Sequence, residues 1–129
     1  MTEQSTDVVR LKLPHEKNMA KIVRLTTAAV ASKTGLNLDQ ADDLQTGLDE
    51  LFRLFLADEN PPLGRLCIRF NLAPEKLEVI TEGISHDLFE DNEINHYSRF
   101  VLERIADRME QLPNPRGGYE VILIKSLTE

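Results

Sequence analysis

The sequence predicts an α+β protein, a two-layer sandwich in which a mostly antiparallel sheet is covered on one face by three helices. Three observations support this prediction: four segments have the alternation or the apolar composition of strands, three segments have helical spacing, and short turns join neighbouring strands. Three amphipathic helices need an apolar face to cover, and one sheet provides it. A length of 129 residues is typical of one domain, which we place at 8–127 after a disordered segment at 1–7.

The first half of the chain is predicted to form one strand and two helices. Alternating residues over 8–13 indicate a half-buried strand, which Pro14 ends. Apolar residues at three- and four-residue steps predict a helix over 16–33. Asn37, followed by Gln40 three residues later, has the form of a capping box and predicts a second helix that ends near residue 58.

The second half is predicted to contain a hairpin, an acidic loop, a helix and a last strand. The last strand is apolar enough to lie inside the sheet, and Cys67 is expected to be a small buried or half-buried residue. We expect four phenylalanines, Phe52, Phe55, Phe70 and Phe100, in the core. In order, the expected elements are strands at 65–72 and 76–81, a loop at 83–95, a helix at 95–111, a turn at 112–118 and a strand at 119–126.

Composition narrows the class of function. The formal net charge is -7, which argues against non-specific nucleic-acid binding, since that needs a basic face. A single cysteine excludes an internal disulfide and a thiolate zinc cluster, and we expect no metal site. No apolar run approaches the roughly 18 residues of a membrane span, and no signal peptide is recognisable. We therefore expect a cytoplasmic protein that makes no membrane contact.

Several segments, taken in order, resemble one family. This chain is similar to the anti-sigma-factor serine kinases of bacteria, a branch of the GHKL ATPases, whose fold is called the Bergerat or histidine-kinase-like fold. The resemblance runs from about Val8 to Leu127 and implies that fold. The segments that carry it are Val23 to Ala31, Leu48 to Glu50, Leu77 to Ile80, Phe100 to Asp107 and Gly118 to Val121.

The resemblance implies a catalytic role for the second helix, but only half of the motif is present. The family has Glu-x-x-x-Asn there: the glutamate polarises the attacking group and the asparagine holds Mg²⁺. Glu50 matches the glutamate, whereas Leu54 stands at the asparagine position and cannot bind a metal. Glu50 is most simply interpreted as an ordinary glutamate on the helix surface, and the alternative is a relict site residue.

The two other nucleotide motifs of the family are also altered. In place of Asp-x-Gly-x-Gly the chain keeps Gly83, and Glu82 replaces the aspartate only if the loop shifts. The family's glycine-rich lid is replaced by residues 95–99, where Arg99 is left to attract an anion. Glu50, Glu82, Gly83 and Arg99 are thus the candidate nucleotide residues. Because all three motifs are damaged, no cofactor is expected, although ATP with magnesium stays an alternative.

The resemblance also implies a protein partner. In the family an arginine of the first helix contacts the sigma factor and the anti-anti-sigma factor, and Arg24 matches it, with Thr27 beside it. The alternative is that Arg24 belongs to the solvated face of an amphipathic helix. The leading hypothesis is a homodimeric anti-sigma-like binding protein with a degenerate nucleotide site. Its rivals are an active serine kinase that uses Glu50 as base and Glu82 for adenine, and an adaptor with no sigma factor as partner.

Overall fold

The computed structural model describes residues 7–127. Its helices and strands follow the order that the sequence predicts, except for one additional strand near the C-terminus. In chain order they are β1 (Asp7–Pro14), a 3-10 turn (Lys17–Met19), α1 (Ala20–Thr34), α2 (Leu38–Ala57), β2 (Arg65–Leu72), β3 (Lys76–Ile84), α3 (Glu93–Ile105), β4 (Arg108–Pro113) and β5 (Tyr119–Ser126).

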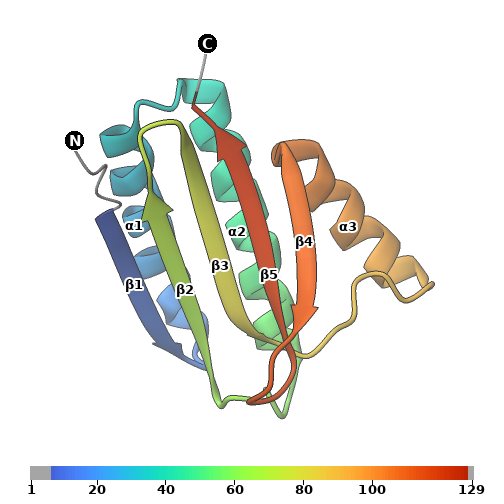
Figure 1. The fold of residues 1–129 in the computed structure, drawn as a ribbon. Helices are drawn as coiled ribbons and strands as arrows, with labels where there is room; N and C mark the ends of the chain where they lie inside the picture. The colour runs from blue at the N-terminus through green and yellow to red at the C-terminus, as the bar shows by residue number, and fades with distance from the viewer. Residues whose placement is uncertain (1–6, 128–129) are drawn as a thin grey trace.

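The five strands form one antiparallel sheet in the order β1-β2-β3-β5-β4. Figure 1 shows α1 and α2 behind this sheet and α3 beside β4, so that the other face of the sheet carries no helix. This arrangement confirms the predicted fold class. It also confirms that the last strand is interior, because β5 pairs with β3 on one side and β4 on the other.

Residues 106–113 correct the prediction. The expected helix over 95–111 ends at Ile105, and β4 follows where helix and turn were expected. Met109 follows Ile105 at a helical step of four, which produced the wrong interpretation. Pairing with β5 along its whole length satisfies the backbone of β4, and this long-range contact outweighs the local pattern.

Local signals at the helix ends agree with the structure. The side chain of Asn37 accepts a hydrogen bond from the backbone N–H of Gln40, and the Gln40 side chain accepts one from the Asn37 N–H, which completes the capping box. Gly35 ends α1 in the left-handed conformation with φ of 81°. These caps fix where α1 stops and α2 begins, and hence how the two helices lie against the sheet.

The core lies between the sheet and the helices. Phe52, Phe55 and Phe70 are buried there as expected, and Cys67 is half-buried. Phe100 corrects the prediction, because its side chain is 59% exposed on the outer side of α3. The buried residues of α3 are Asn95, Ser98, Leu102 and Ile105. This stripe turns Phe100 toward solvent.

Candidate functional site

Glu50 lies on α2 and its side chain is buried, with 7% of the residue exposed. This burial corrects the interpretation of Glu50 as a surface glutamate. Its carboxylate accepts a hydrogen bond of 2.6 Å from the hydroxyl of Ser98 on α3. It also accepts two from the guanidinium of Arg53, at 3.0 and 2.6 Å. The hydrogen bond to Glu50 raises the pKa of Arg53 above its usual value. Both oxygens of the carboxylate therefore accept hydrogen bonds from protein donors.

Leu54, one turn after Glu50, is buried at 2% exposure. An aliphatic side chain in the core offers no oxygen to Mg²⁺, which prefers oxygen ligands. Within residues 7–127 no three His, Cys, Asp or Glu side chains group closely enough to hold a metal ion. Leu54 therefore supplies no oxygen ligand for magnesium at this position.

Helix α3 closes over Glu50 through a close approach to α2. A Cβ at Gly47 would collide with the side chain of Ile105, so that glycine permits this packing. Ser98 is fully buried in the same contact. Ser98 did not emerge as a candidate from the sequence. The signal was present, because Ser98 and Asn95 are the two polar members of the buried stripe of α3.

Glu82 and Gly83 lie at the end of β3, and the structure separates Glu82 from Glu50. Strand alternation turns Thr81 toward the helices, where it is fully buried, and turns Glu82 to the opposite face of the sheet. There Glu82 pairs with Arg116 at 2.7 Å. Glu82 therefore lies on the other face of the sheet from Glu50 and is paired with Arg116, and its role in reading adenine stays a prediction. Gly83 has φ of 114° at an irregularity of the strand, and a Cβ there would lie 2.6 Å from a backbone oxygen of β2.

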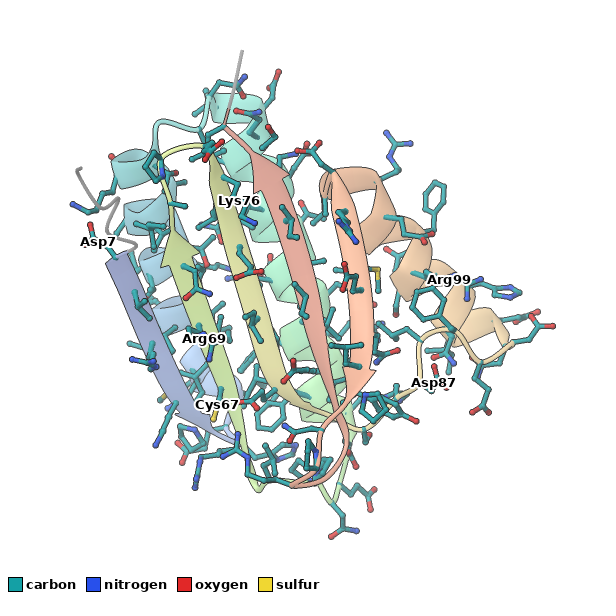
Figure 2. The ribbon with its side chains drawn as sticks, viewed as in Figure 1. Asp7, Cys67, Arg69, Lys76, Asp87 and Arg99 are labelled. Carbon is teal, nitrogen blue, oxygen red and sulfur yellow. The ribbon has the colours of Figure 1, made fainter. Side chains whose placement is uncertain are left out.

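The acidic loop between β3 and α3 is held by hydrogen bonds with side chains of β4 and α3. The side chain of Gln111 on β4 bonds the carbonyl of His86 at 2.7 Å and the N–H of Leu88 at 2.8 Å. Asn95 donates to the carbonyls of two loop residues. Arg99, seen on α3 in Figure 2, donates to the carbonyl of Leu88 at 3.1 Å, and its guanidinium lies over the ring of Phe89. Arg99 therefore holds the loop.

The two predicted partner residues of α1 differ in accessibility. Arg24 is exposed, with 60% of its side chain accessible, and pairs with Asp49 of α2 at 3.3 Å. Thr27 is fully buried and donates its hydroxyl to the carbonyl of Val23 at 2.7 Å. This burial corrects the prediction that Thr27 contacts a partner. It leaves Arg24 as the accessible member of the pair.

The fold and the buried glutamate of α2 define an α+β protein whose architecture is consistent with a GHKL-type ATPase domain. No protein-family model matches the chain. The chain is a distant relative of the serine-protein kinases RsbW. That of Bacillus velezensis is 28% identical over 131 residues, which cover 97% of this chain and 76% of the relative. That of Bacillus subtilis is 26% identical over 134 residues, covering 98% and 78%. Over the range the structure describes, no helix is long and apolar enough to cross a membrane.

Proposed function

We propose that this protein is an anti-sigma-like regulator that acts in the cytoplasm by binding a protein partner and does not turn over ATP. The observation that carries the proposal is the state of Glu50. A catalytic glutamate must reach a hydroxyl or a water at the γ-phosphate, whereas this carboxylate is buried and bonded to Ser98 and Arg53. The occupied carboxylate supports a structural role for Glu50.

The surroundings of Glu50 support the same conclusion. Leu54 supplies no ligand for magnesium. The region of the family's glycine-rich lid is the first part of α3, which begins at Glu93 and has no glycine. Admission of a nucleotide between α2 and α3 would require the Glu50–Ser98 hydrogen bond to break and α3 to move away.

The exposed face of α1 supports the binding role. Among the residues that the structure describes, the Arg24 side chain is held only by an exposed ion pair, which is worth about 0–1 kcal/mol and is therefore easily exchanged for a partner's carboxylate. Leu25 next to it is 63% exposed. A hollow of about 300 Å³ lies between α1 and α2, lined by small and apolar side chains that include Ala28 and Leu38. A partner surface that fits would have an acidic group that pairs with Arg24 and, beside it, an apolar side chain that fills the hollow.

The identity of the partner rests on the family resemblance. We propose a sigma factor, an anti-anti-sigma factor, or both in turn, with this protein acting as a homodimer. The acidic net charge of -7 suits a partner with basic flanks.

Nucleotide binding is tested by thermal shift and calorimetry with ATP and ADP, each with and without Mg²⁺, beside the Bacillus subtilis RsbW protein as a reference. We expect no magnesium-dependent shift for this chain. A magnesium-dependent shift that Glu50→Gln abolishes would overturn the proposal of a closed site.

Partner binding is tested by affinity copurification from the host, with mass spectrometry directed at sigma factors and their antagonists. The Arg24→Ala variant is compared with Lys33→Ala, an exposed cation on the same helix. We expect a sigma factor or antagonist with the wild type and Lys33→Ala, and loss of it with Arg24→Ala. Retention of the partner by a folded Arg24→Ala protein would contradict the role of Arg24.

The alternative function is an active serine protein kinase. The printed name of the relatives, serine-protein kinase, favours it. Transfer of the γ-phosphate of ATP to a serine of a copurified antagonist would establish it. Recovery of partners that include no sigma factor or antagonist would instead indicate an adaptor of another signalling complex.

A further inference from the structure

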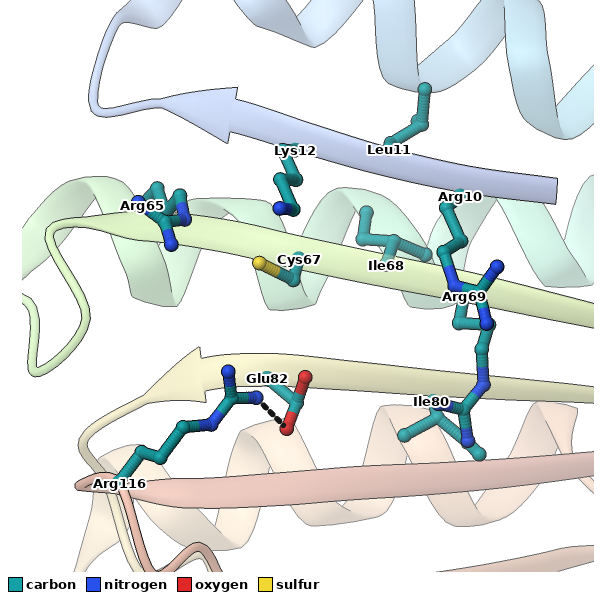
Figure 3. A pocket seen from close by; sticks show the side chains of 10 residues that line it. All are labelled: Arg10, Leu11, Lys12, Arg65, Cys67, Ile68, Arg69, Ile80, Glu82 and Arg116. Atoms are coloured by element: carbon teal, nitrogen blue, oxygen red, sulfur yellow. Dashed lines mark hydrogen bonds and ion pairs between the residues drawn. The ribbon is translucent and has the colours of Figure 1, made fainter.

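The face of the sheet that carries no helix has a cavity of about 130 Å³ over β1, β2 and β3. Figure 3 shows its lining from close by. One third of the chain's fifteen lysines and arginines lie around it, although the protein is acidic overall. The charged residues of the lining are Arg10, Lys12, Arg65, Arg69, Arg116 and Glu82.

The cations of β1 and β2 are brought together by the strand register. Arg10 lies directly opposite Arg69, and Lys12 lies opposite Cys67. Like charges at directly opposed positions destabilise a sheet. Within residues 7–127, the four cationic side chains of these two strands have no ion pair and no side-chain hydrogen bond. Their charge is therefore available to an external anion.

The one carboxylate of the cavity does not neutralise these four cations. Glu82 accepts hydrogen bonds from Arg116 at 2.7 Å and from Asn114 at 2.9 Å. This contact raises the pKa of Arg116 above its usual value. Figure 3 shows the Arg116–Glu82 pair at the end of β3, Lys12 and Arg65 near β1 and β2, and Arg69 reaching across β3 toward Ile80.

The size and spacing of the cavity select the ligand. A volume of 130 Å³ is smaller than the roughly 300–1,000 Å³ of sites that enclose drug-sized molecules, so the enclosed group must be compact. The Arg10–Arg69 row and the Lys12–Cys67 row lie two residues apart along the strands, about 7 Å. Four unpaired cations around one small cavity suit a compact anion with several charged oxygens, such as a diphosphate, because guanidinium groups bind phosphate oxygens through paired hydrogen bonds.

We propose that this cavity binds a diphosphate group. The group is either free inorganic diphosphate or the diphosphate of a nucleotide whose base and sugar lie outside the cavity. This site lies on the opposite face of the sheet from Glu50 and is independent of the proposed partner binding. It gives the protein a means of responding to the concentration of a phosphate compound.

Cys67 provides a direct reporter, because it lines the cavity and is the only cysteine in the sequence. The experiment measures the rate of Cys67 alkylation by iodoacetamide with and without inorganic diphosphate or ADP, without added magnesium, together with calorimetric titrations. The test variant is Arg10→Gln with Arg69→Gln, which also removes an unfavourable like-charge pair and should fold. The matched control is Arg104→Gln, an exposed cation on α3.

We expect inorganic diphosphate to slow alkylation and to bind with a measurable Kd. Loss of two charged hydrogen-bond donors should raise this Kd by about tenfold or more in the double variant, and Arg104→Gln should leave it within about twofold. Stronger protection by ADP assigns the nucleotide as the source, and equal or weaker protection assigns free diphosphate. Unchanged alkylation with both ligands, or an equal loss of affinity in Arg104→Gln, would overturn the proposal.

Discussion

The hydrogen bond from Ser98 to the carboxylate of Glu50 should stabilise the folded protein, and the effect of Ser98 should depend on the presence of that carboxylate. Ser98→Ala removes a buried hydroxyl that donates to a charged acceptor at 2.6 Å. Hydrogen bonds to charged groups contribute about 1.5–3 kcal/mol, and Glu50 keeps its two bonds from Arg53, so we expect a loss of about 2 kcal/mol in the free energy of unfolding. Glu50→Ala leaves the Ser98 hydroxyl buried without its acceptor, and the expected loss is about 3 kcal/mol.

The double variant makes this reasoning refutable. If Ser98 acts through Glu50, Ser98→Ala with Glu50→Ala should destabilise no more than Glu50→Ala alone, because it also removes the unpaired hydroxyl, and the coupling energy should be at least about 2 kcal/mol. Urea denaturation followed by circular dichroism measures all four proteins. Ser32→Ala, an exposed serine on α1, is the control and should stay within about 0.5 kcal/mol of the wild type. Additive losses, or a Ser98→Ala protein as stable as the control, would refute the reasoning.

Three further predictions concern stability, measured by the same urea denaturation. Arg24→Ala should change the free energy of unfolding by at most about 0.5 kcal/mol, because its ion pair is exposed; a larger loss would show that its effect on partner capture is not specific. Gly83→Ala should destabilise by about 1 kcal/mol more than Gly64→Ala. Both positions have positive φ, but only at Gly83 would a Cβ meet backbone, and equal losses would contradict this. Arg69→Glu, placed opposite Arg10, should stabilise by about 0.5 kcal/mol at low salt and less at high salt, and a loss at low salt would contradict the like-charge repulsion.

The sequence predicted the fold where local signals and long-range packing agree. The capping box at Asn37 set the start of α2, and alternation over 65–72 set a strand that the sheet confirms. The prediction was wrong at β4. This strand has only six residues, too few for a clear alternation, and the helical step from Ile105 to Met109 indicated a helix instead. The pairing that decides β4 is with β5, and a pattern within one segment does not contain that information.

The candidate site was predictable in part. Alternation from Leu77 through Val79 to Thr81 assigns those residues to one face, and the same rule assigns Glu82 to the other. The position of Glu82 could therefore be predicted from the sequence. The burial of Glu50 could not, because it depends on where α3 lies. Gly47, Glu50 and Leu54 form a second buried stripe of α2, beside the stripe that faces the sheet.

Contacts along this second stripe connect stability with the proposed loss of catalysis. Gly47 approaches Ile105, whereas Glu50, farther along α2, meets Ser98, which precedes Ile105 in α3. The two helices therefore run antiparallel at this contact, and Glu50 is enclosed between them. A nucleotide that entered there would have to replace the donors of Ser98 and Arg53 and the packing at Gly47. Because Leu54 offers no oxygen ligand, no magnesium ion bound there would offset the free energy lost when the nucleotide displaced these contacts. Under the proposed function, the interaction that stabilises α3 against α2 is therefore also the barrier to ATP.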